Sequence, residues 1–221
     1  ERSFCTAAPR KRKIASSCPD MLRVGIYGGT FSPVHKGHVA AARAFMEQMW
    51  LDVLFIIPTG ETPHKQMSEG ASSADRLNMC KLAFAGMDGV IVSDIEILRK
   101  GKSYTVDTLK TFSVNSEDRL FLLCGTDMML TLDKWKDADE IFKLCYPVYI
   151  RREKDSSLDS KIISKIAEYK QKYGKNVVKL TVEPIEISSN QIRDMIKNQK
   201  DASAYLPRGV YEYIKKEGLY L

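Results

Sequence analysis

Short apolar runs alternate with helical stretches along most of this chain, and this alternation constrains the fold more than any other feature. Strands are expected over residues 24–28, 53–57, 90–93, 119–124, 146–151 and 177–182. Helices are expected over residues 38–50, 73–86 and 105–112, and near 158–173, 190–198 and 207–217. Strands and helices in this order predict βαβ units and a parallel sheet.

The expected strands VGIYG, VLFIIP and LFLLC are nearly continuous apolar runs, as in strands whose two faces are both covered by helices. The first helix has an apolar face that we expect in the core, comprising Val39, Ala42, Phe45, Met46 and Met49. Loops are expected at residues 155–160 and 173–175. The sequence therefore predicts an α/β fold with a Rossmann-like open parallel sheet and helices on both faces.

Residues 1–20 differ in composition from the rest of the chain. They hold five basic residues against two acidic ones, and so carry half of the net charge of +6. They contain no apolar stretch of the signal-peptide type. The basic run at residues 10–13 indicates either a nucleic-acid patch or a short unstructured tail, native or added in cloning, and the tail is favoured. We therefore expect a tail over residues 1–20 and one domain over residues 21–221.

The apolar runs are far shorter than the ~20 residues needed to span a bilayer, so no membrane contact is expected. The five cysteines form no CxxC pair, which argues against a disulfide framework and a zinc site. Free thiols in a reducing cytoplasm fit this pattern best. Cys124 and Cys145 lie in apolar surroundings and are expected to be small buried residues instead of nucleophiles.

The segment GGTFSPVHKGH, residues 28–38, joins the first expected strand directly to the first expected helix. Open α/β sheets bind nucleotides at such a place. Gly28 and Gly29 let the backbone approach a phosphate closely, and a helix start offers unpaired N–H groups with a partial positive charge. The segment therefore indicates a phosphate-binding loop.

His35 and His38 are two of the three histidines in the chain. Their spacing places them on one side of the loop-to-helix junction, where both can face a common anion. A capping or packed histidine is the alternative for each ring, and a zinc site would lack a third nearby ligand. Because the pair lies within a glycine-rich strand–loop–helix, phosphate binding is favoured.

Residues 28–38 follow the pattern GxFxPxHxGH, which resembles the signature of the HxGH nucleotidyltransferase superfamily. The doubled glycine resembles the bacterial nicotinate-nucleotide adenylyltransferases in particular. Ser32 stands where those proteins usually carry Asp or Asn. The resemblance extends over nearly all of residues 21–221.

Further motifs resemble the same family and follow in its order. Pro63, His64 and Lys65 resemble its PHK loop, and SYTVDTL at residues 103–109 resembles its substrate-side helix start. Gly125, Asp127 and Trp135 resemble its GxDxxxxxxxW pattern. ISSNQIR at residues 187–193 resembles its ISSTxIR, with Asn190 in place of the usual Thr.

The resemblance implies an enzyme that joins the AMP part of ATP to nicotinate mononucleotide and releases pyrophosphate. It implies catalytic roles for His35, His38 and Arg193, with His38 on the α-phosphate and His35 on neighbouring phosphate oxygens. The implied ATP-binding residues are Gly28, Gly29, Thr30, Phe31, Gly125, Asp127, Ser188 and Ser189. The residues alone leave alternatives open: Ser189 and Asp127 as helix N-caps, and Arg193 as an exposed face residue.

The implied mononucleotide-binding residues are Lys65, Tyr104, Thr105, Asp107 and Trp135. A flat indole at Trp135 suits stacking on a pyridine ring, although a place in the core is the commoner fate of tryptophan. Simple helix capping is the alternative for the residues at 104–107, and a solvated loop lysine is the alternative for Lys65.

Magnesium is expected to arrive with ATP, because the sequence shows no DxD-like cage, and no metal site of the protein itself is expected. The expected partners are ATP and nicotinate mononucleotide, without nucleic acid or membrane, and a homo-oligomer is left open. The alternatives are another HxGH enzyme, either pantetheine-phosphate adenylyltransferase or a cytidylyltransferase, and a non-catalytic nucleotide-sensing or RNA-binding module. Pantetheine-phosphate adenylyltransferases and cytidylyltransferases lack the two motifs SYTVDTL and GxDxxxxxxxW.

Overall fold

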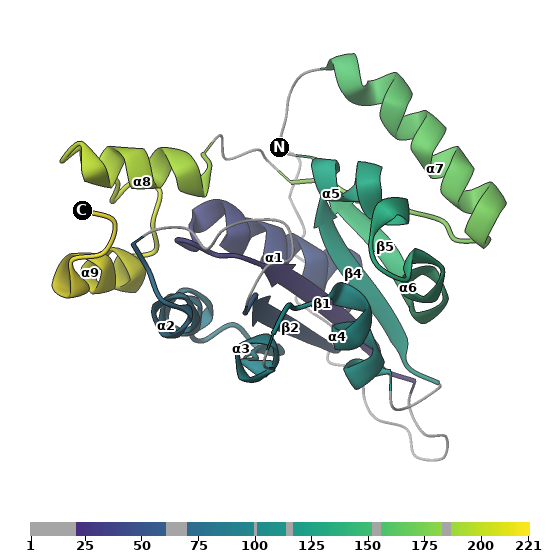
Figure 1. The fold of residues 1–221 in the computed structure, drawn as a ribbon, viewed down its shortest axis with the longest axis horizontal. Helices are drawn as coiled ribbons and strands as arrows, with labels where there is room; N and C mark the ends of the chain where they lie inside the picture. Colours follow the sequence, from purple (N-terminus) through teal and green to yellow (C-terminus); the bar gives the residue numbers. More distant parts are fainter. Residues whose placement is uncertain (1–20, 61–69, 100, 114–116, 152–155, 183–186) are drawn as a thin grey trace, which may run out of the picture.

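The fold is taken from a computed structural model, which describes residues 21–60, 70–99, 101–113, 117–151, 156–182 and 187–221. Its centre is a six-stranded sheet in the order β3-β2-β1-β4-β5-β6 (Figure 1). The strands are β1 (Arg23–Gly29), β2 (Val53–Pro58), β3 (Val90–Val92), β4 (Arg119–Gly125), β5 (Cys145–Ile150) and β6 (Val178–Leu180). All neighbouring strands pair in parallel, so the predicted open parallel sheet is confirmed.

Helices cover both faces of the sheet (Figure 1). The first face is covered by α1 (Lys36–Gln48), α2 (Ser73–Phe84), α8 (Ser189–Lys197) and α9 (Arg208–Glu217). The second face is covered by α4 (Thr105–Phe112), α5 (Thr126–Thr131), α6 (Ala138–Leu144) and α7 (Asp159–Tyr173). The apolar face expected on the first helix is confirmed, because Ala42, Phe45 and Met49 of that segment are buried.

The buried residues of β4 show why the apolar runs are continuous. Phe121 and Leu123 pack with the helices of the first face, whereas Leu120, Leu122 and Cys124 pack with those of the second. Successive side chains of a strand point to opposite faces, so a strand covered on both sides needs apolar residues at every position. The sheet is therefore internal, as predicted.

The cysteines that the structure describes are Cys80, Cys124 and Cys145, and all three are free and buried. Burial raises the pKa of the Cys124 thiol to about 12, which keeps it in the unreactive protonated form at neutral pH. The expectation that Cys124 and Cys145 are small buried residues is confirmed.

Several short helices were not expected from the sequence. They are α3 (Ile95–Leu98), α5, α6 and the 3₁₀ helix η1 (Leu132–Lys134). Segments this short complete too few turns to show a helical period. The loop expected at residues 155–160 is wrong in part, since the 3₁₀ helix η2 (Ser156–Leu158) leads into α7 at Asp159. The expected tail over residues 1–20 and the segment holding Lys65 lie outside the described residues.

The strand order reverses direction between β1 and β4. From β1 the chain proceeds outward through β2 and β3, and from β4 it proceeds the other way through β5 and β6. In open α/β sheets the loops that follow the two strands at such a point leave a crevice in which ligands bind. Within the described residues, no helix is both long and apolar enough to cross a membrane.

Candidate active site

The phosphate loop, residues 28–38, leaves β1 and enters α1 without regular structure over most of its length. Its backbone carbonyls accept hydrogen bonds from side chains that are distant in sequence. Arg76 Nη1 of α2 donates to the Thr30 carbonyl at 2.9 Å. From α8, Arg193 Nη1 donates to the Ser32 carbonyl at 2.7 Å and Ser189 Oγ to the Pro33 carbonyl at 3.0 Å. Partners of this kind compensate for the missing strand or helix bonds of a buried loop.

Arg76 is fully buried, with a relative exposure of 0%. Its Nη2 lies 3.5 Å from the Gly60 carbonyl, and its Nε has no hydrogen-bond partner among the residues that the structure describes. Burial lowers the pKa of this guanidinium, because removal from water disfavours the charged form. The positive charge of Arg76 therefore lies directly behind the phosphate loop, and sequence reasoning missed it because a buried arginine in a helix has no distinguishing pattern.

The two predicted histidines cap the start of α1. His35 is the N-cap residue, and its Nδ1 accepts the backbone N–H of Gly37 at 3.2 Å. The backbone N–H of His35 in turn donates to Nδ1 of His38 at 3.1 Å. Capping, which the sequence left open as an alternative, is therefore present. Because Nδ1 of each ring accepts, the ring hydrogen of the neutral imidazole lies on Nε2, which makes Nε2 the donor nitrogen.

The two imidazole rings lie against each other, with centroids 3.7 Å apart. Both side chains are buried. The ring of Phe31 meets the ring of His38 edge-on at 5.1 Å, and it packs in the same way against Tyr27. Phe31 itself has a positive φ of 49°, an uncommon backbone conformation for a bulky residue. The predicted site residues at 31, 35 and 38 thus form one packed unit at the loop-to-helix junction.

Ser32 occupies the position at which the sequence departs from the expected motif. Its side chain is buried, and its Oγ lies 3.1 Å from the hydroxyl of Tyr220, near the end of the chain. Burial raises the pKa of Tyr220 to about 12, so the hydroxyl keeps its hydrogen at neutral pH. The polar group at residue 32 therefore has a partner built into this chain.

The structure contradicts two alternatives that the sequence left open at α8, one for Ser189 and one for Arg193. Ser188 is the N-cap and forms a capping box with Gln191, so the alternative that Ser189 is the N-cap is wrong. Arg193 also donates from Nη2 to Asn190 Oδ1 at 2.7 Å. Because Arg193 contacts both this side chain and the phosphate loop, its alternative reading as a solvated face residue is wrong as well.

A cavity of about 290 Å³ opens beside the phosphate loop on the second face of the sheet. Six predicted site residues line it: Gly28, Gly29, Thr30, Tyr104, Thr105 and Trp135. Gly28 has open space where a side chain would begin, so a ligand can approach its backbone directly. The structure thus brings part of the predicted ATP set and part of the predicted mononucleotide set to one cavity.

Other predicted residues lie outside this cavity. Gly125 caps α5 after β4, and the exposed Asp127 lies in the first turn of α5, so the alternative of Asp127 as the N-cap is wrong. Asp107 is half-buried in the first turn of α4, and Tyr104 is the N-cap of that helix without a side-chain cap bond. The histidines lie within the phosphate loop and Ser189 and Arg193 of α8 contact it, but none of them lines the cavity.

Sequence reasoning missed several residues that line the cavity. Glu96 of α3 is buried there, and Thr108 Oγ1 donates to its Oε1 at 2.7 Å. Burial raises the pKa of the Glu96 carboxyl, although the bond from Thr108 works against that change. Lys136 also lines the cavity, with Nζ 4.2 Å above the ring centre of Tyr104. Thr108 lies in the quoted SYTVDTL motif, whereas the helix of Glu96 had no recognisable pattern.

The strand order, the phosphate loop at its reversal point and the adjoining cavity together define a nucleotide-binding enzyme fold. The family model described as cytidylyltransferase-like matches residues 26–195. The chain therefore belongs to the cytidylyltransferase-like family of nucleotidyltransferases.

Curated relatives narrow this class to the nicotinate-nucleotide adenylyltransferases. A protein of Clostridium botulinum (strain Eklund 17B) named "Probable nicotinate-nucleotide adenylyltransferase" is 36% identical over 90% of this chain and 98% of its own length. A protein of the same name from Clostridium acetobutylicum is 34% identical over 91% of this chain and 100% of its own length.

A solved structure agrees with this fold. The nicotinic acid mononucleotide adenylyltransferase of Plasmodium falciparum, complexed with NaAD, superposes with a TM-score of 0.73 at 18% identity. The superposition covers 90% of this chain and 97% of that one. The Rossmann-like nucleotidyltransferase fold is thereby confirmed.

Proposed function

We propose that this enzyme transfers the AMP part of ATP to nicotinate mononucleotide, giving deamido-NAD and pyrophosphate. The observation that carries the proposal is the junction between the phosphate loop and the cavity, where Gly28, Gly29 and Thr30 belong to both. A triphosphate lying along the loop and a pyridine nucleotide in the cavity would meet there. The names of the curated relatives support the same reaction.

Chemistry at this junction needs positioning and charge stabilisation alone. An oxygen of the mononucleotide phosphate attacks the α-phosphorus of ATP, the bond from that phosphorus to the bridging oxygen breaks, and pyrophosphate leaves with the electron pair. No covalent enzyme group takes part. We assign His38 to the α-phosphate and His35 to neighbouring oxygens, each through the Nε2 hydrogen that the cap geometry fixes.

Arg193 and the start of α8 complete the proposed phosphate site. The guanidinium already contacts the phosphate loop through the Ser32 carbonyl, so it lies within reach of a bound triphosphate. The first turn of a helix offers backbone N–H groups to anions, and Ser189 extends that set with a hydroxyl. We place Gly125 and Asp127, at the end of β4, on the ribose side of the crevice.

The cavity suits the pyridine ring of the mononucleotide. The half-buried Trp135 offers a flat indole for stacking, and the first turn of α4 at Tyr104 and Thr105 faces the same space. Backbone N–H groups of a first helical turn can only donate, so they favour a carboxylate over a carboxamide. We therefore propose the acid, nicotinate mononucleotide, as the preferred substrate.

Magnesium would be bound chiefly by the ATP phosphates. Among the residues that the structure describes, no three His, Cys, Asp or Glu side chains are grouped as a metal site would require. The donors present around the phosphate loop are guanidinium, imidazole, hydroxyl and backbone N–H groups, which suit phosphate oxygens and not a hard cation. When bound, the ion would neutralise charge on the pyrophosphate that leaves.

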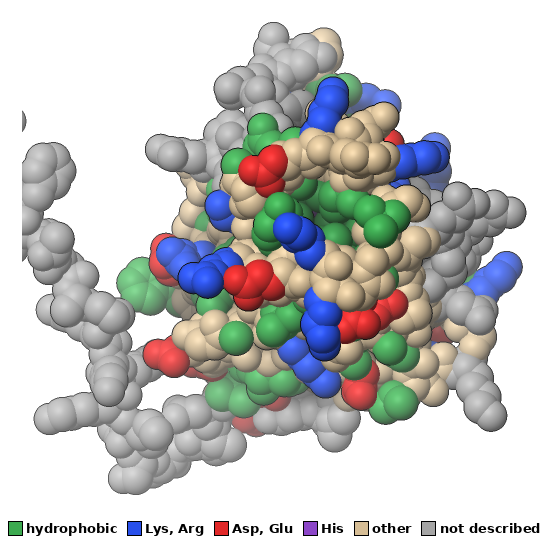
Figure 2. All heavy atoms as spheres, turned by 90° about the vertical axis from the view of Figure 1, so that its left-hand side faces the viewer, with side chains coloured by type: hydrophobic (Ala, Val, Ile, Leu, Met, Phe, Trp, Pro, Cys, Tyr) green, Lys and Arg blue, Asp and Glu red, His purple; other side chains and the backbone are tan. Residues whose placement is uncertain are grey.

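A second candidate function, nucleic-acid binding, finds less support. Figure 2 shows the face formed by α2, α8 and α9, on which Lys and Arg side chains are interspersed with Asp and Glu. Proteins that bind nucleic acid usually gather their basic residues into a patch or stripe.

We also place the enzyme in the cytoplasm, because free buried thiols suit a reducing compartment.

The proposal is tested by pyrophosphate release from ATP and magnesium, with the acceptor varied. Nicotinate mononucleotide should release pyrophosphate and form a dinucleotide of the mass of deamido-NAD, whereas 4′-phosphopantetheine and reactions without acceptor should release none. Turnover with 4′-phosphopantetheine, or with CTP in place of ATP, would contradict the assignment and favour a related transferase.

A further inference from the structure

The cavity wall, residues 126–136, consists of very short helices. Helix α5 has six residues and η1 has three. Isolated helical segments of this length are unstable in water, so their geometry depends on tertiary contacts. Trp135 follows η1 directly, and its backbone N–H donates to the Leu132 carbonyl at 3.2 Å. The placement of the indole therefore depends on whatever holds α5 and η1.

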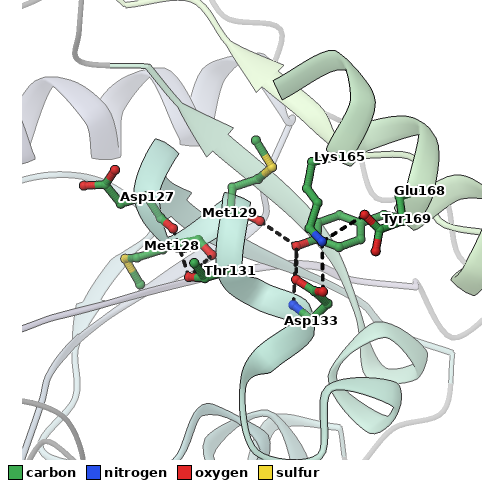
Figure 3. Close-up of polar contacts among 8 residues, drawn as sticks. All are labelled: Asp127, Met128, Met129, Thr131, Asp133, Lys165, Glu168 and Tyr169. Carbon is green, nitrogen blue, oxygen red and sulfur yellow. Dashed lines mark hydrogen bonds and ion pairs between the residues drawn. The ribbon is translucent and has the colours of Figure 1, made fainter. Parts of the chain in front are cut away.

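A single hydroxyl group bridges these two short helices (Figure 3). Tyr169 of α7 is fully buried, and its hydroxyl donates to the Met129 carbonyl of α5 at 2.8 Å. The same oxygen accepts the backbone N–H of Asp133 in η1 at 3.3 Å and lies 3.0 Å from Asp133 Oδ1. One phenol thus fixes the end of α5 relative to η1.

Lys165, one turn earlier on α7, holds the other oxygen of the Asp133 carboxylate. Its Nζ lies 2.9 Å from Asp133 Oδ2 and 2.9 Å from Glu168 Oε2. Burial acts to raise the pKa of Asp133, but the hydrogen bonds from Lys165 and Tyr169 outweigh it and lower the pKa. Figure 3 shows that the side chain of Asp127, a predicted ATP residue, points away from this cluster.

We propose that Tyr169 is a positioning residue that sets the orientation of Trp135 through the bridge to α5 and η1. No residue of α7 lines the cavity among those the structure describes there, so the effect passes entirely through Asp133 and Met129. The inference rests on the proposed function, in which Trp135 stacks on the pyridine ring. It makes a distinct prediction: loss of the Tyr169 hydroxyl weakens binding of the mononucleotide more than binding of ATP, because Trp135 follows η1 directly, whereas Asp127 lies at the start of α5, next to the end of β4.

The first test compares Tyr169→Phe with Tyr173→Phe. Both tyrosines lie on α7 and pack their rings against Phe142, so the second variant is a matched control for loss of a hydroxyl. Tyr169→Phe should raise the KM for nicotinate mononucleotide about fivefold to tenfold, the loss expected for one or two hydrogen bonds, and leave the KM for ATP within about twofold. Tyr173→Phe should leave both values within about twofold.

The second test observes Trp135 directly. The chain has two tryptophans, and Trp50 is 79% exposed at the end of α1, so Trp50→Phe leaves Trp135 as the single tryptophan, which is excited at wavelengths that tyrosine does not absorb. In this background Tyr169→Phe should lower the steady-state anisotropy of Trp135, and Tyr173→Phe should not. A merely structural role of Tyr169 would lower the melting temperature without moving either the KM ratio or the anisotropy.

Equal KM ratios and equal anisotropies in the two tyrosine variants would overturn the proposal. If Tyr169→Phe does not fold, Asp133→Ala takes its place with the same expected direction, because it removes the carboxylate through which Tyr169 and Lys165 of α7 hold η1. A wild-type protein that does not turn over nicotinate mononucleotide would instead contradict the proposed function, and the anisotropies would still decide the role of Tyr169.

Discussion

The phosphate loop and the cavity wall lie side by side in the site but are stabilised by different means. Carbonyl groups of the loop accept hydrogen bonds from Arg76 of α2 and from Arg193 and Ser189 of α8. The wall is a pair of short helices with buried apolar side chains, and Tyr169 and Lys165 of α7 form hydrogen bonds to it. Two of the donors to the loop backbone are charged, whereas the hydroxyl that reaches the wall backbone is neutral. Hydrogen bonds from charged donors are stronger, so we expect the loop backbone to be the more strongly fixed.

We expect the two regions to serve different purposes, the loop the rate of the reaction and the wall the choice of pyridine nucleotide. A fixed loop presents its donors in one geometry to the phosphates, as charge stabilisation in a transition state requires. In the proposed function the wall contacts the pyridine ring, which does not react, so changes there should alter which pyridine nucleotide binds. Variants in the loop should therefore lower the rate, and variants in the wall should alter KM and discrimination.

The largest effect is expected for His38→Ala. Loss of one donor to the developing charge should lower kcat by ~10²–10³ while ATP binding and folding are largely retained. Steady-state kinetics with a melting curve measures both. A kcat within about threefold of the wild type would remove His38 from the catalytic set.

A smaller effect, on KM, is expected for Arg193→Ala. The KM for ATP should rise about tenfold or more, since a hydrogen bond to a charged group contributes ~1.5–3 kcal/mol. Titration of ATP at saturating mononucleotide gives the value. An unchanged KM would mean that Arg193 only holds the Ser32 carbonyl and does not contact ATP. The phosphate loop would then lack the charged ATP contact that we assign to it.

Glu96→Gln tests the electrostatics of the cavity side. Burial raises the folded pKa of Glu96 above its unfolded value, so the wild type loses stability as pH rises from the unfolded pKa through the folded one. Glutamine keeps an acceptor for Thr108 without ionising. The variant should therefore gain melting temperature relative to the wild type as pH is raised from 4 to 8, and exposed Glu47→Gln should not.

The smallest effect is expected for Asn190→Thr. Both side chains are polar, and the Asn190 contact to Arg193 is exposed, so kcat/KM should stay within about twofold. Assays of kcat/KM for both substrates check this. A large loss would show that Arg193 needs this particular partner to face the phosphates.

Sequence patterns predicted the loop better than the wall. The loop is recognisable from its adjacent glycines and paired histidines between a strand and a helix, all within residues 28–38. The wall contains α5 and η1, which are too short to show a period, and Glu96 lies on the equally short α3.

Residues that support the site from a distance were not predicted either. Arg76 and Tyr169 are far in sequence from the atoms they hold, and each lies on an ordinary helix. In a sequence they are indistinguishable from an exposed arginine and a core tyrosine. Only the fold shows which backbone groups they contact.

The proposed acid preference depends on the first turn of α4. A carboxylate facing the first turn of α4 gains ~0.3–2 kcal/mol from the helix dipole. A carboxamide directs an N–H group at donors and leaves it unsatisfied, at ~1–3 kcal/mol. Taken together, these effects favour the acid by roughly 1.3–5 kcal/mol, which corresponds to a factor on the order of 10 to 5,000 in kcat/KM.

The most direct test of this account is kcat/KM for nicotinate mononucleotide against nicotinamide mononucleotide, measured on one preparation with saturating ATP and magnesium. The arrangement of Trp135 beside the start of α4 predicts a ratio on the order of 10 to 5,000 in favour of the acid. A ratio near one would contradict the placement of the pyridine substituent against the backbone of Tyr104 and Thr105.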